Sequence, residues 1–349
     1  MRRIAVWNTA FLGDAVLTLP LVQSLRLRYP HAAIDFYVRG GLAPLFAPHP
    51  DIASVFAYNK RGGDSLTRLG RHVFSRRYDL WVSAHTSLRS ALFAFASRAG
   101  MRIGYTAPAL GGLFYTHRVD RQFKQREEIE RLLALLQPLG DGPVSDWPRL
   151  ALAPEAACRA DEFFAEREKE QGALLPVLGL HPGSVWATKR WPVGYFAEIG
   201  RRALAHGAQV LVFGGPGEEE MAHELVRCIN PQKDAAQRLH DLSGALSLPV
   251  LAAFLGRLSC YVTNDSGPMH MAWAQGTPVT ALFGPTVREL GFFPRGPQSR
   301  VWEIPLSCRP CGLHGPKRCP LGHHHCMTQL EADMIWPDVS QKLFTHGRA

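Results

Sequence analysis

The stretch that decides the fold is Cys260–Thr286, with the sequence CYVTNDSGPMHMAWAQGTPVTALFGPT. It begins with a short apolar run, which is followed by a polar turn, a helical segment, a Gly-Thr-Pro turn and a second apolar run. This order predicts a βαβ unit. Such units bind ligands at the carboxyl ends of their parallel strands.

The polar turn inside this stretch has residues that suit an anion. Asn264, Asp265 and Ser266 are of the types that cap a following helix. Gly267 allows a ligand to approach the backbone closely, and the N–H groups at a helix start favour phosphate. His270 follows within the first turns and can point at the same anion. The alternative is an ordinary α/β turn with a capping Asp and a surface His.

Two further loops are predicted at the same edge of a parallel sheet, because each follows an apolar strand of the second half of the chain. They cover residues 181–192 and 214–219. A nucleoside diphosphate fits their polar residues, since a Lys meets phosphates and a carboxylate accepts from a ribose hydroxyl. With the first turn, the loops supply Ser184, Thr188, Lys189, Glu218, Asp265, Ser266, Gly267 and His270. Lys189 beside Arg190 is alternatively a pair of surface cations.

The start of the chain predicts a second sheet of the same kind. Arg3–Trp7 is a compact apolar run, and a loop containing Gly13 leads into a helical pattern after Asp14. The loop lacks G-x-G-x-x-G, which disfavours a dehydrogenase. Asp14 is a candidate general base, because a carboxylate at the end of a strand can take the proton of a hydroxyl group. It is equally a candidate helix cap, and both roles can hold.

Strands and helices alternate through both halves, so we predict an α/β protein with two doubly wound domains. Residues 140–155 are rich in Gly, Pro and Asp, which places the boundary near residue 160. The predicted domains are 1–160 and 161–328, and a helix follows within 329–349. Thr106–Gln125 is predicted to be a mobile loop because it combines Gly-Gly with aromatic and basic residues.

Length and charge limit the classes of function. The 349 residues are 46% apolar and 20% charged, as in a globular protein. No apolar run approaches the roughly 18 residues of a membrane span, and no signal peptide is recognised, so a cytoplasmic protein is expected. The net charge is +9. Residues 1–150 carry all of it, with 20 basic and 11 acidic residues, whereas residues 151–349 hold 19 of each.

A basic half of this kind predicts a polyanionic partner, such as nucleic acid, anionic lipid or a phosphorylated glycolipid. A generic solvated surface is the alternative. Nucleic acid is disfavoured because no recognised motif is present and few aromatic residues are interspersed among the basic ones.

The motifs together resemble glycosyltransferase family 9, the ADP-heptose:lipopolysaccharide heptosyltransferases, over most of the chain. Three parts carry the resemblance: the opening RIAVWNTAFLGDAVLTLP, the pattern H-P-G…K-x-W-P from His181 to Pro192, and D-x-G-x-x-H from Asp265 to His270. The family often has paired Ser before Leu-Gly-Asp, where this chain has Thr9-Ala10-Phe11. A different acceptor is one explanation of that departure.

The resemblance implies the GT-B fold, with two Rossmann-like domains and the active site between them. It implies that residues 1–160 bind the acceptor, that 161–328 bind the nucleotide sugar, and that the C-terminal helix returns to the first domain. Asp14 would be the base and Lys189 a catalytic cation. The other predicted donor-binding residues are Ser184, Thr188, Glu218, Asp265, Ser266, Gly267 and His270. The predicted acceptor-binding residues are Gly13, Lys60 and Arg61.

The implied reaction is inverting transfer of heptose from ADP-heptose to the lipopolysaccharide inner core. It would take place on the inner face of the cytoplasmic membrane, with the protein peripheral to that anionic surface, without nucleic acid and without a cofactor for catalysis. A transferase or epimerase for another nucleotide sugar is an alternative. A non-catalytic module that binds anionic glycolipid is another.

One motif lies outside this scheme. Cys308, Cys311, Cys319 and Cys326 fall within 19 residues, close to several His. Such a cluster in a cytosolic chain favours a metal over disulfides, and four thiolates or three with an imidazole suit structural zinc. The spacing is not that of a standard zinc finger. Unmetallated thiols, labile disulfides and an iron–sulfur cluster stay open.

Overall fold

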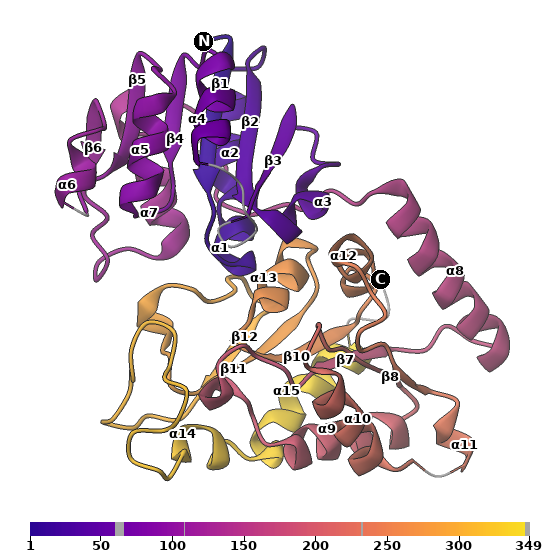
Figure 1. Cartoon of the computed structure of the whole chain (residues 1–349). Helices are drawn as coiled ribbons and strands as arrows, with labels where there is room; N and C mark the ends of the chain where they lie inside the picture. The colour runs from indigo at the N-terminus through magenta and orange to yellow at the C-terminus, as the bar shows by residue number, and fades with distance from the viewer. Residues whose placement is uncertain (60–65, 108, 232, 346–349) are drawn as a thin grey trace. The chain divides into compact units, whose positions relative to one another are not determined.

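The computed structural model describes residues 1–59, 66–107, 109–231 and 233–345. The chain divides into two compact units, Met1–Ala153 and Pro154–Ala349 (Figure 1). The division falls seven residues before the predicted boundary at 160. The reason is that helix α8 (Pro154–Gln171) packs against α12 (Leu248–Leu255) of the second unit and so belongs to that unit from its first residue.

The first unit is built on a parallel six-stranded sheet in the order β3-β2-β1-β4-β5-β6. Its strands are β1 (Arg3–Asn8), β2 (Ala33–Arg39), β3 (Ser54–Tyr58), β4 (Leu80–Ser83), β5 (Met101–Tyr105) and β6 (His117–Val119). Its α-helices are α1 (Leu12–Leu17), α2 (Leu19–Arg28), α3 (Ala43–Phe46), α4 (Leu66–Ser75), α5 (Leu88–Ala96), α6 (Ala109–Gly112) and α7 (Glu128–Ala134), and 3₁₀ turns lie at Gly40–Leu42 and Gln137–Leu139.

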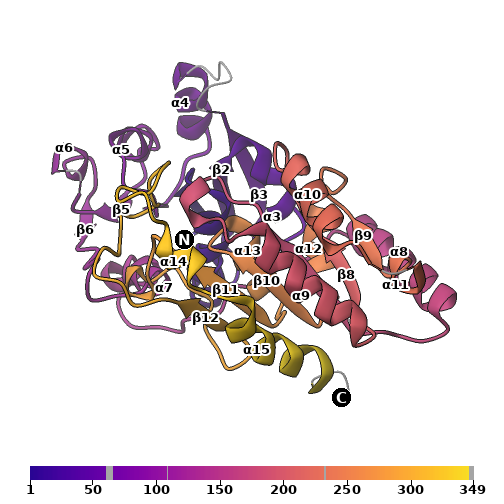
Figure 2. The same cartoon turned by 90° about the horizontal axis from the view of Figure 1, so that it is seen from below.

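This strand order is doubly wound, because the chain runs outward from β1 to β3 and then crosses back to β4 and continues to β6. Right-handed crossovers in opposite directions place helices on both faces of the sheet. Helices α4, α5 and α6 form a row, as Figures 1 and 2 both show. The inner faces of α4 and α5 pack on an aromatic core that includes Trp7, Tyr37 and Trp81. The predicted Rossmann-like topology is therefore present in this unit.

The segment predicted as a mobile loop, Thr106–Gln125, contains regular structure. Strand β6 pairs in parallel with β5, and α6 precedes it. Tyr115 is buried between them against Gly104, where a Cβ would lie 2.3 Å from the tyrosine ring. A strand of three residues at a sheet edge is too short to show an alternating apolar pattern, which is why the sequence did not reveal it.

The second unit repeats the plan with a parallel sheet in the order β12-β11-β10-β7-β8-β9. Its strands are β7 (Val177–His181), β8 (Gln209–Val212), β9 (Leu239–Asp241), β10 (Cys260–Asn264), β11 (Val279–Phe283) and β12 (Arg300–Glu303). Besides α8 and α12, its helices are α9 (Val193–Ala205), α10 (Glu219–Ile229), α11 (Lys233–Ala236), α13 (Gly267–Ala274), α14 (His325–Thr328) and α15 (Ala332–Thr345), with 3₁₀ turns at Ala187–Lys189 and Arg288–Leu290.

The strand order of this sheet reverses between β7 and β10. The chain runs from β7 outward to β9, then returns to β10 on the other side of β7 and continues to β12. The loops after β7 and β10 therefore leave the same edge side by side. This is the switch point at which doubly wound sheets bind their ligands. The predicted loop residues of the second half are thus brought to one place.

The C-terminal helix α15 packs on the core of the second unit. The apolar face of α15 presents Ile335, Val339 and Leu343 to the second core. Lys342 of the same helix is buried, and its Nζ donates to the carbonyl of Val279 and to Asp338. An amphipathic pattern predicts a helix but not the surface that it covers. Among the described residues, no helix is long and apolar enough to cross a membrane.

Candidate functional site

An ion pair joins the two loops that meet at the switch point. Nζ of Lys189, in the loop after β7, lies 2.6 Å from Oδ2 of Asp265, which directly follows β10. Both side chains are about nine-tenths buried. The hydroxyl of Thr286, after β11, donates to the same carboxylate oxygen at 2.7 Å. Three strand ends therefore converge on one carboxylate, which holds the Lys189 cation inside the site.

The loop after β7 is fixed by backbone contacts as well. Asn264, the last residue of β10, accepts from the Trp191 N–H through Oδ1 and donates through Nδ2 to the carbonyl of Pro182. Within the loop, the Arg190 guanidinium donates to the carbonyl of Ser184. Ser184 and Thr188 are both buried. The loop is thus held in one shape before any ligand arrives, which reduces the entropy lost on binding.

Glu218 lies at the third predicted loop and reaches the first. Its Oε2 accepts from the Gly215 N–H at 2.9 Å and lies 3.0 Å from Nε2 of His181. Burial alone would raise the pKa of Glu218, but the hydrogen bond and charge of His181 hold it below its ordinary value. The carboxylate rests on Gly183, where a Cβ would come within 2.3 Å of its Cδ. The glycine is therefore needed for this contact.

Helix α13 begins at the predicted anion-binding turn. Ser266 is its N-cap residue, and Gly267 and Pro268 follow. His270 is 96% buried, and its Nδ1 has no hydrogen-bond partner among the described residues. Burial, with the Lys189 cation, lowers the pKa of His270 to about 4, although Asp265 opposes the shift. The imidazole is therefore neutral at pH 7. A buried ring nitrogen without a partner is a ready ligand contact.

The sequence did not indicate that the segment 308–326 would form part of this site. The hydroxyl of Thr188 donates to the carbonyl of Pro316 at 2.5 Å, and Nε2 of His324 lies 2.6 Å from the carbonyl of Thr188. The ring of His314 stacks on Trp186 with an interplanar angle of 7°. Burial and the Lys189 cation lower the pKa of His314. The segment 308–326 therefore packs beside the loop that follows β7.

Hydrogen bonds attach the segment 308–326 to the end of β11. The guanidinium of Arg309 donates to the carbonyls of Phe283 and Thr286 and also to Glu303. The N–H of Cys311 donates to the carbonyl of Pro285. These contacts link residues far apart in the sequence, so local patterns could not reveal them. A cluster of His and turn residues that follows a strand end is the signal that could have been noticed.

The four cysteines of this segment are all free thiols. In the described part of the chain, no group of three or more His, Cys, Asp or Glu side chains is arranged to hold a metal ion. The arrangement therefore does not support the predicted zinc site at Cys308, Cys311, Cys319 and Cys326. Burial raises the pKa of Cys326 to about 11, so that thiol is protonated at neutral pH.

In the first unit, Asp14 occupies the third position of helix α1 rather than its N-cap. Its Oδ2 accepts the N–H of Phe11, the N-cap residue, at 3.1 Å. The side chain of Asn8 at the end of β1 donates to the Asp14 carbonyl and to Thr18. Gly13 is buried next to Asp14 in the same helix. The carboxylate therefore stabilises the helix start from the third helical position, whereas the alternative interpretation of the sequence had placed Asp14 at the N-cap.

The pKa of Asp14 is raised to about 6. Burial is the main cause and the charge of Glu128 adds to it, whereas the Phe11 N–H and the Arg121 cation act in the opposite direction. Glu128 is itself held by two guanidinium groups, with Arg121 Nη2 at 2.7 Å from both oxygens and Arg131 Nη1 at 2.9 Å. A carboxylate with a pKa near 6 can accept a proton at neutral pH.

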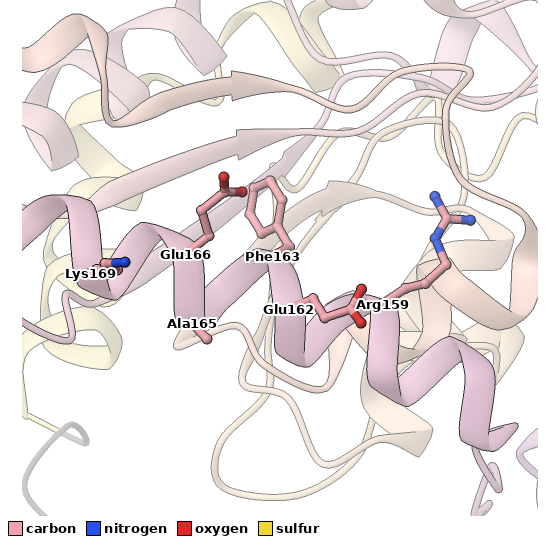
Figure 3. Close-up of a pocket in the computed structure, with 6 residues that line it drawn as sticks. All are labelled: Arg159, Glu162, Phe163, Ala165, Glu166 and Lys169. Atoms are coloured by element: carbon pink, nitrogen blue, oxygen red, sulfur yellow. The ribbon is translucent and has the colours of Figure 1, made fainter.

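Two predicted acceptor contacts, Lys60 and Arg61, lie outside the described residues. A surface pocket lies along helix α8 (Figure 3). It shares no residue with the loops of the candidate site. Its lining mixes charges of both signs and consists of Arg159, Glu162, Phe163, Ala165, Glu166 and Lys169.

A chain with two Rossmann-like units of this strand order has the GT-B fold. The family profile "Glycosyltransferase family 9 (heptosyltransferase)" matches residues 66–315. The chain belongs to this family, and it is a glycosyltransferase. The resemblance seen in the sequence is thereby confirmed.

Curated relatives agree with this assignment. The lipopolysaccharide heptosyltransferase 2 of Salmonella typhimurium is 28% identical over 298 residues, which cover 81% of this chain and 83% of that protein. Its Escherichia coli counterpart is 27% identical over 297 residues, with the same shares covered.

Solved structures give the same fold. A glycosyltransferase family 9 protein from Veillonella parvula has a TM-score of 0.86 and 25% identity, and the match covers 99% of this chain and 98% of that one. The ADP-heptose lipopolysaccharide heptosyltransferase II of Escherichia coli has a TM-score of 0.78 and 23% identity, with 99% of each chain covered.

Proposed function

We propose that this enzyme transfers heptose from ADP-heptose to the inner core of lipopolysaccharide, with inversion at the anomeric carbon. The family supports heptose as the transferred sugar, and the names of the relatives at 27–28% identity support lipopolysaccharide as the acceptor. The observation that carries the proposal is the buried Lys189–Asp265 pair at the switch point, beside the unpartnered nitrogen of His270. The Lys189 cation and the free ring nitrogen of His270 suit the diphosphate of a nucleotide sugar.

In this reaction the acceptor hydroxyl attacks the anomeric carbon of heptose from the face opposite ADP. The new C–O bond forms as the bond from that carbon to the diphosphate oxygen breaks, and the electron pair leaves with ADP. The hydroxyl proton passes to the carboxylate of Asp14, which we assign as the general base. The raised pKa of this group favours the role, because a base with a pKa near the working pH is the more effective one.

The donor contacts are assigned to the second unit. Lys189 and the N–H groups at the start of α13 stabilise the negative charge that develops on the leaving diphosphate. Ser184, Thr188 and Ser266 offer hydroxyl groups to the phosphates or the sugar, and Gly267 lets them approach the backbone. Glu218 accepts from a ribose hydroxyl. Asp265 keeps the Lys189 cation in place, and His270 contacts the sugar or phosphate through its neutral ring.

The acceptor contacts are assigned to the first unit, at Gly13, Lys60 and Arg61. The basic composition of this half suits a phosphorylated glycolipid at the inner face of the cytoplasmic membrane. The proposed reaction needs no cofactor, because the Asp14 carboxylate takes the proton and Lys189 stabilises the leaving diphosphate. Metal analysis of the purified protein tests the zinc prediction, and protein without zinc would rule it out.

A transfer assay tests the proposal. The purified protein is incubated with ADP-heptose and heptose-less core, and the product mass should increase by one heptose. A panel of other nucleotide sugars tests the alternative donors, and recovery of an altered free nucleotide sugar without acceptor would indicate an epimerase. A non-catalytic glycolipid module would bind the acceptor but not ADP. Absence of transfer from ADP-heptose, with turnover of another nucleotide sugar, would overturn the proposed donor.

A further inference from the structure

Helix α5 carries apolar side chains on both of its faces. Its inner face presents Ala91 and Ala94 to the core of the first unit. Its outer face presents Leu88, Leu92 and Phe95 at a spacing of four and three residues, with 47%, 47% and 58% of each residue exposed. A surface helix normally carries polar residues on its outer side. The outer stripe of α5 is therefore not explained by folding of the first unit.

The neighbouring helices extend this stripe into a patch. Leu66 and Phe74 of α4 are exposed, and so is Leu113 after α6. The guanidinium of Arg98 lies over the ring of Phe74, and Phe95 packs edge-on against Phe114. These contacts connect α4, α5 and the α6 region into one layer, which Figures 1 and 2 show as a row of helices. Contiguous exposed apolar surface usually marks an interaction site.

The segment that contains the three helices is rich in basic residues. Residues 66–118, which contain all three helices, include eight Arg and a single acidic residue, Asp79. The carboxylate of Asp79 is occupied, since it accepts from the backbone N–H groups of Arg2 and Arg3. Arg71 of α4 and Arg89 of α5 are both exposed at this layer. The patch therefore combines exposed apolar side chains with exposed cations.

We propose that the outer layer of α4, α5 and α6 is the surface with which the first unit binds an anionic phospholipid bilayer. Leu88, Leu92 and Phe95 would enter the boundary between headgroups and acyl chains, as the apolar face of an interfacial helix does. The Arg side chains would extend to the lipid phosphates, and their aliphatic stems would cover the apolar rim. The Arg side chains would also suit a protein partner with acidic groups. The exposed apolar side chains Leu88, Leu92 and Phe95 of α5 favour lipid acyl chains instead.

Binding to vesicles tests this proposal without donor or acceptor, so its outcome is independent of heptose transfer. The full chain should co-sediment with phosphatidylcholine vesicles that contain phosphatidylglycerol, and much less with pure phosphatidylcholine. Leu92→Ser/Phe95→Ser should lower the partition coefficient by about tenfold, because less apolar surface leaves water. Arg71→Gln/Arg89→Gln should lower it by a similar factor and should also weaken its dependence on salt.

Matched controls separate the patch from general surface changes. Val144→Ser/Leu174→Ser removes two exposed apolar side chains elsewhere, and Arg159→Gln/Lys169→Gln removes two exposed cations of α8. Both controls should bind vesicles like the natural sequence. Equal binding by the patch variants would overturn the proposal. A dimer in gel filtration that Leu92→Ser/Phe95→Ser converts to a monomer would also overturn it, because the layer would then be an interface between two copies.

Discussion

Replacement of Gly183 by Ala tests the role assigned to Glu218 without touching that residue. A Cβ at position 183 would lie 2.3 Å from Cδ of Glu218 and 2.4 Å from each carboxylate oxygen. The carboxylate must therefore move and lose its contacts with His181 and the Gly215 N–H. Since the displaced group is the end of a flexible side chain, the backbone can keep its path. The substitution should therefore displace the side chain of Glu218 and leave the protein folded.

The expected loss of affinity for ADP follows from the hydrogen bond that the displaced carboxylate can no longer accept from a ribose hydroxyl. Hydrogen bonds to charged groups contribute about 1.5–3 kcal/mol. A loss of this size raises the Kd for ADP roughly 10- to 150-fold, as isothermal titration calorimetry would measure. Gly194→Ala is the matched control, because nothing lies within 4 Å of its added Cβ. If Gly183→Ala binds ADP as tightly as the natural sequence does, Glu218 does not hold the nucleoside.

Three further predictions concern the base, the buried ion pair and the C-terminal helix. Because Asp14 must be deprotonated to act as a base and its pKa is raised to about 6, kcat should increase with pH through about 6 and then level off. A kcat that does not change between about pH 5 and 8 would argue against this base. Lys189→Met leaves the carboxylate of Asp265 buried without its cation, so the free energy of unfolding in urea should fall by about 3–5 kcal/mol. The double variant Lys189→Met/Asp265→Leu should recover part of that loss, and an additive loss would show that the two side chains do not interact. Leu343→Ala should cost about 2–5 kcal/mol, because Leu343 is fully buried in the second unit. A loss below about 0.5 kcal/mol would contradict the packing of α15.

The parts of the fold that could be predicted are those that a local pattern determines. The apolar runs of β1, β7 and β10 are long enough to be seen, and parallel strands bring the loops that follow them to one edge. That rule was sufficient to expect Lys189 and Asp265 close together, and the structure pairs them at 2.6 Å. Their roles in binding the donor stay predictions.

The parts that could not be predicted depend on contacts between distant segments. Thr286 follows β11 and contacts Asp265, and Pro316 lies after β12 and contacts Thr188. No local spacing in the sequence indicates these contacts. The contacts of α15 with the second unit were not foreseen for the same reason, since Lys342 reaches Val279 and Thr280 of β11 from far along the chain. The return of the C-terminal helix to the first unit stays a prediction. The edge strand β6 was missed because three residues carry too little pattern.

The measurement that tests the central claim most directly is the turnover of Asp14→Asn with ADP-heptose and heptose-less core. Asparagine keeps the size of the side chain but cannot accept the proton of the attacking hydroxyl. The account predicts that kcat falls by about 10²- to 10⁴-fold, while the Kd for ADP stays unchanged because the donor contacts are assigned to the second unit. Normal turnover by Asp14→Asn would contradict the assignment of Asp14 as the general base.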